Sequence, residues 1–204
     1  MIIDNQEKIW DKIAPEWHEF KKLPSLEATK FLNKSHGKIL DFGSGSGRNL
    51  LKLKKSSKRE IYLADFSGEM LRLAEKRAKE LGIKIKTKKT NLKKTDFKDN
   101  FFDAAICTAV IHCIETDGKR KASIKELYRI LKPGAEAEIE VWKKNSPRFK
   151  NSPKEKFIAW NDKGMRYYYL YEEKEIYDLF KKIGFKIIKK IADINNIIFI
   201  AQKP

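Results

Sequence analysis

A glycine-rich loop is the first part of the sequence in which residue types and spacing could do chemistry. In the stretch ILDFGSGSG, three glycines alternate with serines directly after a short apolar run and Asp41. Such a loop after the first strand of an α/β sheet brings the backbone close to a bound nucleotide. Gly43 and Gly45 fit the dinucleotide pattern G-x-G-x-x-G, but Arg48 takes its third position and the last glycine is Gly47. This departure favours a nucleoside ligand without phosphates, with a simple tight turn as the alternative.

Polar side chains stand at the ends of the first three predicted strands, where a nucleoside would need them. Asp41 could accept hydrogen bonds near an ammonium group, or merely cap the loop backbone. Asp65 ends the second strand, where a carboxylate can bind both ribose hydroxyls; without a ligand it would serve as a helix N-terminal carboxylate. Asn91 follows the third strand, and its amide could read an adenine edge. Because open α/β sheets bind ligands at the carboxyl ends of their strands, these residues predict a site for a nucleoside that carries an amino-acid group.

The elements that must position these residues alternate along the chain. We expect helices over residues 5–20, 25–34, 47–56, 67–82, 120–134 and 172–184, and strands over residues 38–42, 61–66, 83–90, 101–111, 136–142, 185–193 and 195–203. This alternation predicts a Rossmann-like α/β fold, with a mostly parallel seven-stranded sheet, helices on both faces and a C-terminal antiparallel hairpin. Pro15 should break or kink the first helix, and the lysine-rich strand 83–90 should lie at a sheet edge.

The chain reads as a single domain, because 204 residues suit one substantial core. We expect N-terminal helices over the site in residues 1–35 and a ligand-binding core in residues 36–142. A basic loop is expected in residues 143–166, and the last helix and the hairpin in residues 167–204.

The composition indicates a polyanionic partner. Lysine and arginine number 45 against 28 aspartate and glutamate residues, so the net charge is +17. Nucleic acid is the first candidate and an anionic membrane surface the second, while a lysine-rich proteome is the plain alternative. The two cysteines, Cys107 and Cys113, have no zinc-ligand spacing, so we expect no metal and a reducing, cytoplasmic location. We expect no membrane segment, because no apolar run approaches spanning length.

At the level of motifs, the chain resembles the class I S-adenosylmethionine-dependent methyltransferases. ILDFGSGSG is similar to their first motif, LADFS to the acidic second, TNLKKTDFKDNFFD to the third, FFDAAICTAVIH to the fourth and ELYRILKPGAEAEIEVW to the fifth and sixth. The resemblance implies S-adenosylmethionine as methyl donor, with the loop glycines under its methionine and ribose, Asp65 on the ribose hydroxyls and Asn91 accepting from the adenine amine. The cofactor-binding residues that it implies are Asp41, Gly43, Gly45, Gly47, Asn49, Asp65, Phe66, Asn91, Leu92 and Thr108.

A narrower resemblance covers nearly the whole chain. WDKIAPEWHEFKKLP, AVIHCIETDGKRKASIKELYRILKPGAEAEIEVW and RYYYLYEEKEIYDLF are similar to segments of the tRNA wobble-uridine carboxymethyl methyltransferases. That family esterifies a carboxymethyl group at C5 of uridine 34 in the anticodon, and its module is fused to an AlkB-type oxygenase in some eukaryotic proteins. The resemblance implies a tRNA substrate and a small zinc-binding activator protein, which would pair with the edge strand near residues 84–90. The chain departs from the family at Lys21 and Lys22, where an arginine is usual, and at Cys113 after His112.

The substrate-side residues follow from this chemistry. A carboxylate needs no deprotonation at neutral pH, so we expect His112 and Lys21 to position the substrate and Trp142 to stack on the uracil. A hydroxyl nucleophile would instead make His112 the base, and both His112 and Trp142 could be structural. The expected RNA-binding residues are Lys22, Lys143, Lys144, Arg148, Lys150 and Arg166.

Two other functions stay open at this point. The chain could methylate another substrate, such as rRNA, a protein or a small molecule. It could also be a binding module without transfer activity, although the complete glycine loop together with Asp65 argues against that.

Overall fold

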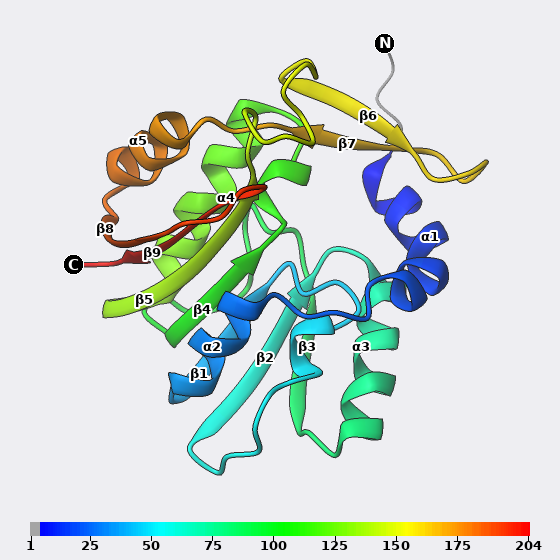
Figure 1. Cartoon of the computed structure of the whole chain (residues 1–204). Helices are drawn as coiled ribbons and strands as arrows, with labels where there is room; N and C mark the ends of the chain where they lie inside the picture. Colours follow the sequence, from blue (N-terminus) through cyan, green and yellow to red (C-terminus); the bar gives the residue numbers. More distant parts are fainter. Residues whose placement is uncertain (1–4) are drawn as a thin grey trace.

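The computed structural model describes residues 5–204 and has a seven-stranded sheet at its centre (Figure 1). The strand order is β3-β2-β1-β4-β5-β9-β8. Strands β1 to β5 are parallel, β9 is antiparallel to β5, and β8 is antiparallel to β9. This confirms the Rossmann-like fold and its C-terminal hairpin. The strand bounds are Gly37–Phe42 (β1), Arg59–Asp65 (β2), Ile85–Lys89 (β3), Phe102–Thr108 (β4), Leu131–Trp142 (β5), Lys186–Ile191 (β8) and Asn196–Gln202 (β9).

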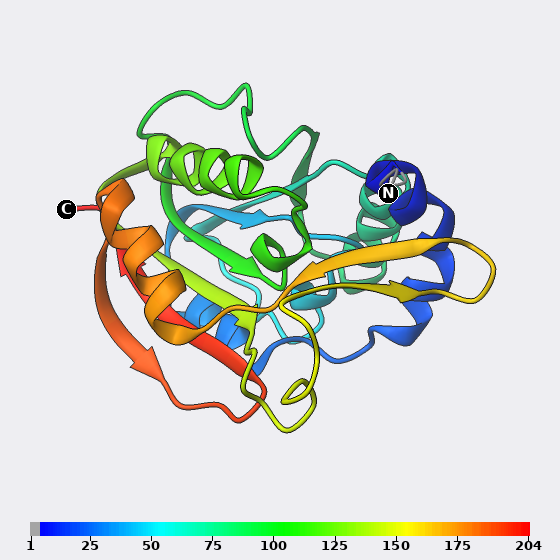
Figure 2. The same cartoon turned by 90° about the horizontal axis from the view of Figure 1, so that it is seen from above.

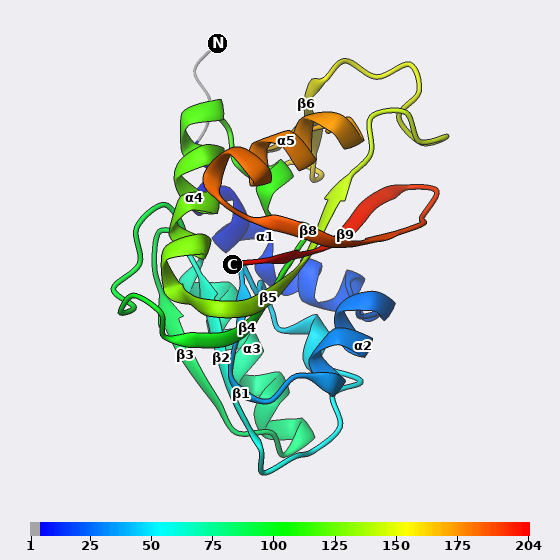
Figure 3. The same ribbon diagram turned by 90° about the vertical axis from the view of Figure 1, so that its left-hand side faces the viewer.

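Helices cover both faces of the sheet (Figure 3). Helices α4 (Asp117–Ile130) and α5 (Glu173–Ile183) pack on the face that buries Leu40 and Phe42 of β1. Helices α2 (Leu26–Lys34) and α3 (Gly68–Leu81) pack on the face that buries Ile39. Successive side chains of a strand point to opposite faces, so the apolar run of β1 contributes to two separate cores.

A third layer lies over the carboxyl ends of the strands. It consists of α1 (Gln6–Phe20) and a separate antiparallel pair, β6 (Glu155–Ala159) and β7 (Met165–Tyr169). Seen from above, this pair reaches across to α1, where the Gln6 side-chain amide donates to the Met165 carbonyl at 3.1 Å (Figure 2). No helix within residues 5–204 is long and apolar enough to cross a membrane.

Two expectations about helices were wrong. Helix α1 continues through Pro15, because Ala14 is fully buried against α3 beside Met70 and holds the helix on that surface. The expected helix 47–56 is only a 3-10 turn, η1 (Arg48–Leu50). The chain that follows it is instead held by Asn33, which donates to the Lys52 carbonyl and accepts from the Lys54 N–H.

The expected basic loop 143–166 and the expected strand 101–111 also differ from the structure. The first contains β6 and the start of β7, two short strands joined around the turn sequence NDKG. The second ends at Thr108, because Ala109 has a positive φ of 61° and turns the chain into the 3-10 turn η2 (Ile111–Cys113). Both differences bring side chains towards the same end of the sheet.

Candidate active site

A cavity of about 1180 Å³ opens at the carboxyl ends of the parallel strands, beneath α1 and the β6–β7 pair. The predicted residues that line it are Lys21, Gly43, Gly45, Asn49, Asp65, Phe66, Asn91, Leu92, Thr108, His112, Trp142 and Arg148. Those that do not are Asp41, Gly47, Lys22, Lys143, Lys144, Lys150 and Arg166. The volume exceeds what one drug-sized ligand occupies, so the cavity has room for a donor and an acceptor together.

The glycine loop is shaped by close packing as well as by what lies in the cavity. A Cβ at Gly43 would come within 2.4 Å of Val110, and one at Gly47 within 3.1 Å of Ala74 on α3. Both glycines have positive φ, 82° and 71°. Gly45 differs, because a Cβ there would meet only the Met70 sulfur at 4.0 Å. At Gly45 the loop therefore presents its backbone to the cavity, beside Ser44 and Ser46, which also line it.

Asp65 joins the end of β2 to this loop. Its carboxylate accepts from the Gly45 N–H at 2.8 Å and from the Ser67 N–H at 2.9 Å. Burial raises the pKa of Asp65 to about 6, and the backbone hydrogen bonds partly offset this effect. Each carboxylate oxygen can accept a further hydrogen bond, so Asp65 retains acceptor capacity towards the cavity.

Asp41 does not line the cavity itself, but a chain of hydrogen bonds connects it to side chains that do. Asn49 donates to Asp41 at 3.3 Å and accepts from the Ser25 N–H at 3.3 Å, and the Ser25 hydroxyl donates to Glu140 at 2.7 Å. Burial raises the pKa of Asp41 to about 7. Glu140, which sequence reasoning missed, lines the cavity from β5. Its place in the alternation EIEVW points it to the same face as Asp41, which could have identified it.

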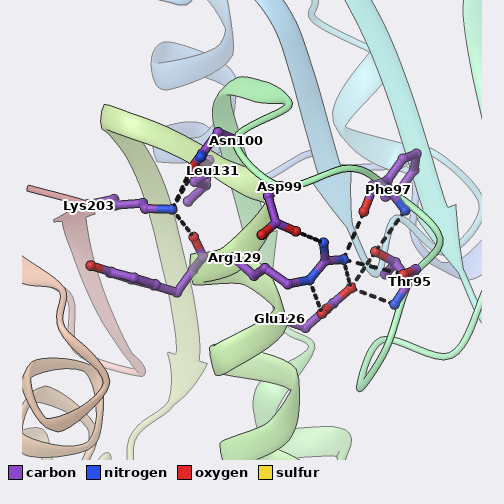
Figure 4. Close-up of polar contacts among 9 residues, drawn as sticks. Thr95, Phe97, Asp99, Asn100, Glu126, Arg129, Leu131 and Lys203 are labelled. Atoms are coloured by element: carbon purple, nitrogen blue, oxygen red, sulfur yellow. Dashed lines mark hydrogen bonds and ion pairs between the residues drawn. The ribbon is translucent and has the colours of Figure 1, made fainter.

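The loop after β3 is fixed to α4. Thr95 donates both its N–H and its hydroxyl to Glu126, at 2.6 and 2.5 Å, and Arg129 joins Glu126, Asp99 and the loop carbonyls (Figure 4). The loop begins with Asn91, whose side-chain oxygen accepts from the Lys93 N–H at 3.0 Å. The oxygen that was expected to bind the adenine amine therefore already has one donor.

His112 has a defined protonation state. Its ring is 1% exposed, and Nδ1 accepts from the backbone N–H of Trp142 at 3.1 Å. Burial lowers the pKa of His112 to about 3, and the positive charges of Arg48, Arg148 and Lys21 act in the same direction. The neutral ring carries its proton on Nε2, because Nδ1 is an acceptor. Nε2 is buried and has no hydrogen-bond partner among residues 5–204, so His112 carries an unused donor and no base, and a bound group would reach this donor only after a neighbouring side chain moves.

Cations surround this donor. Lys21, Arg48 and Arg148 line the cavity together with His112. Burial lowers the pKa of Lys21, and the two arginines lower it further. The lysine Nζ lies over the rings of Trp17 and Phe20, 5.3 Å from each centroid. This end of the cavity is therefore suited to an anionic group.

Trp142 is already in contact with several side chains. Its ring stacks on His112 at 4.8 Å and on Tyr168 at 4.3 Å, and Phe149 lies at 5.0 Å. Cζ of Arg148 is 4.6 Å from the ring centroid. Stacking of a uracil on Trp142 stays a prediction, and it would require one of these groups to move.

The expected RNA-binding residues occupy different environments. Arg166 is a correction, because it is only 6% exposed; it belongs to β7, and its guanidinium donates to the Tyr168 hydroxyl of the same strand at 2.7 Å. Lys143 forms an ion pair with Glu173 at 2.8 Å. Lys144 donates to the Lys150 carbonyl at 3.4 Å. Within residues 5–204, Arg148 is the one predicted RNA-binding residue that lines the cavity.

Comparison with known proteins shows which protein families the chain resembles. Residues 39–134 match the model of a methyltransferase domain family. The tRNA (carboxymethyluridine(34)-5-O)-methyltransferase of Arabidopsis thaliana is 32% identical over 138 residues, which are 66% of this chain and 32% of that protein. The chain spans about a third of the length of this relative and of the mammalian probable tRNA methyltransferases 9B that also match.

Solved structures agree on the fold. An S-adenosylmethionine-dependent methyltransferase from Methanosarcina mazei superposes with a TM-score of 0.75 at 24% identity, over 89% of this chain and 99% of that one. A putative methyltransferase of Haloferax volcanii, solved in complex with the Trm112 methyltransferase activator, gives 0.70 at 14% identity, over 99% of both chains.

The fold, the cavity and these matches together support a class I S-adenosylmethionine-dependent methyltransferase. Within that class it resembles the tRNA carboxymethyluridine methyltransferases. The residues present fit the donor S-adenosylmethionine, because Gly45 leaves open space above the loop and Asp65 retains acceptor capacity that ribose hydroxyls could use.

Proposed function

We propose that the chain methylates the carboxylate of a C5-carboxymethyl wobble uridine in tRNA. The observation that carries the proposal is the neutral His112, a hydrogen-bond donor set among Lys21, Arg48 and Arg148. The name of the plant relative supports the same substrate. The net charge of +17 supports an RNA partner independently.

The chemistry required of the protein is mainly alignment. S-adenosylmethionine supplies, when bound, a methyl group on a positively charged sulfur that a carboxylate oxygen can take without first losing a proton. Lys21 and Arg148 neutralise the acceptor carboxylate, and Nε2–H of His112 donates to one of its oxygens once a neighbouring side chain has moved aside. Since the acceptor is already ionised, the absence of a basic nitrogen on His112 costs the reaction nothing.

We also propose a small activator protein as partner of β3. This strand is at the edge of the sheet, so its outer backbone groups are free to pair with another strand. The Haloferax volcanii chain of the same fold was solved with such an activator. Co-purification of the chain with a candidate activator, and its loss when Thr87 at the centre of β3 is replaced by proline, would test the pairing.

The deciding experiment uses labelled S-adenosylmethionine and tRNA that carries the carboxymethyl nucleoside, with and without the activator. The products are digested to nucleosides and identified by mass before and after alkali. A labelled, alkali-labile wobble uridine is expected. An alkali-stable product would point to another atom of the RNA, and label in rRNA, protein or small molecules but not in tRNA would overturn the proposal.

A further inference from the structure

The two edges of the central sheet are both rich in lysine, and on β3 these lysines are neutralised. Three ion pairs with carboxylates from other elements follow this strand. They are Lys86–Glu60 at 2.9 Å, Lys88–Asp96 at 2.9 Å and Lys89–Glu7 at 2.8 Å. The β3 edge therefore presents little net charge to a partner.

The opposite edge, β8, keeps its charge. Lys186, Lys189 and Lys190 are exposed, and none of them forms an ion pair within residues 5–204. Of the three, only Lys190 forms a cation–π contact within residues 5–204, with its Nζ 4.5 Å from the centroid of Tyr177. We call these three residues the β8 lysine edge.

Two further lysines precede this edge but are partly balanced. Lys181 and Lys182 at the end of α5 lower the pKa of Asp178, whose carboxylate also pairs with Lys174 at 2.6 Å. The β8 lysine edge is therefore the part of this surface whose positive charge is not balanced by an ion pair within the described part of the chain.

The β8 lysine edge leads to the acceptor end of the cavity. Strand β8 runs in the same direction as β5, because each is antiparallel to β9. The turn after β8 consequently lies at the carboxyl end of the sheet, beside the loop that follows β5 (Figure 3). Asn195 and Asn196 of this turn line the cavity, and the Asn195 carbonyl accepts from the Lys143 N–H at 3.1 Å.

We propose that the β8 lysine edge binds the phosphate backbone of the tRNA next to the nucleoside held in the cavity. This inference rests on the proposed function and adds the surface along which the RNA lies. Lysines on an edge strand also discourage strand pairing between molecules. That role does not require the lysines of one edge to be paired and those of the other to be free, whereas phosphate binding requires free ones.

Matched double variants test the proposal. Lys186→Ala with Lys189→Ala removes two unpaired charges, and Lys86→Ala with Lys88→Ala removes two paired charges from the other edge. Affinity for unmodified tRNA is measured by fluorescence anisotropy at several salt concentrations, using the full chain. For the β8 pair we expect affinity to fall on the order of tenfold at low salt and the salt slope to decrease by about 2, with the Kd of S-adenosylmethionine unchanged.

The outcomes separate the two proposals. Equal losses in the two double variants, or a larger loss in the β3 variant, would overturn the β8 surface while leaving the tRNA substrate in place. A wild-type chain that binds no tRNA at any salt concentration, with or without the activator, would overturn the proposed function and this surface with it. Melting temperatures of both variants show whether either change acts through the fold.

Discussion

The backbone N–H of Trp142 donates to Nδ1 of His112 at 3.1 Å, and this one contact decides what His112 can do. It holds the proton of the neutral ring on Nε2, so the residue can act as a hydrogen-bond donor but not as a base. Trp142 also stacks on the same ring at 4.8 Å. The end of β5 thus sets both the orientation and the tautomer of a side chain that η2 supplies.

His112→Ala should lower kcat by about 10²-fold to 10³-fold, because it removes a preorganised donor from the reacting carboxylate. The Kd of S-adenosylmethionine should stay within about twofold, as no contact with the donor is lost. His36→Ala is the matched control, since His36 is exposed and precedes β1 at the other end of the sheet. Full activity of His112→Ala would return this histidine to a structural role.

The kcat of the wild-type reaction should not fall through titration of His112 near pH 6.5. The pKa of His112 is lowered to about 3, so the ring stays neutral throughout the range from pH 5 to pH 8. A general base with an ordinary histidine pKa would instead make kcat fall as the pH drops below 6.5. A kcat profile over this range, measured at saturating tRNA, distinguishes the two.

Asp41 should make the ligand-free protein less stable as the pH rises. Its pKa is raised from 3.8 to about 7 in the folded state, mainly by burial, so the folded protein binds a proton that the unfolded chain has lost. The associated stability is fully present below pH 3.8 and is lost as the pH rises through 7. The effect amounts to up to about 4 kcal/mol. Asp41→Asn should flatten this part of the unfolding free energy measured against pH; an unchanged curve would contradict the assignment.

Asp65→Ala should abolish tight binding of S-adenosylmethionine and should also destabilise the fold. The substitution leaves the Gly45 and Ser67 N–H groups without an acceptor, at about 1–3 kcal/mol each. Asp65→Asn retains an acceptor oxygen and separates the two effects. We expect it to fold normally and to bind the donor about 10-fold to 100-fold more weakly by calorimetry. Unchanged affinity of Asp65→Asn would argue against the ribose assignment.

Glu126→Gln should weaken donor binding from a distance. Glu126 accepts two hydrogen bonds from Thr95, four residues after Asn91, and is joined to the loop through Arg129 (Figure 4). An amide there loses the charge that Arg129 pairs with, at about 1–3 kcal/mol of stability. We expect a roughly three-fold to ten-fold higher Kd for S-adenosylmethionine and a lower melting temperature, with kcat at saturation unchanged. Asp99→Asn, on the exposed side of the same network, should change neither.

The half of the site that binds the donor was predictable because its features are local. Gly43 and Asp65 each fall within a short motif, and strand direction alone places both at one end of the sheet. The acceptor half depends on contacts between distant segments. Glu140 accepts a hydrogen bond from Ser25, 115 residues away in the sequence, and Tyr168 comes from β7, a strand that the sequence did not predict.

In the acceptor half, positive charge in the sequence did not predict which basic residues line the cavity. Arg166 and Arg148 lie in the same basic region of the sequence, yet the first is a buried residue of β7 and the second lines the cavity. Whether an arginine faces solvent depends on how β6 and β7 pair and pack on α1, and no short-range pattern encodes that packing. The chain between β5 and α5 consequently carries the least predictable part of the site.

Arg148→Ala should therefore affect the acceptor selectively. Its guanidinium lies 4.6 Å from the centroid of Trp142 and contributes to the low pKa of His112, so its loss removes a positive charge from the acceptor end. We expect the KM for tRNA to rise on the order of tenfold, with the Kd of S-adenosylmethionine unchanged. Lys150→Ala removes the same charge from the same loop outside the cavity and serves as control. If both variants raised KM equally, Arg148 would act only through the general field of the protein; a selective effect of Arg148→Ala would identify it as a contact to the carboxylate.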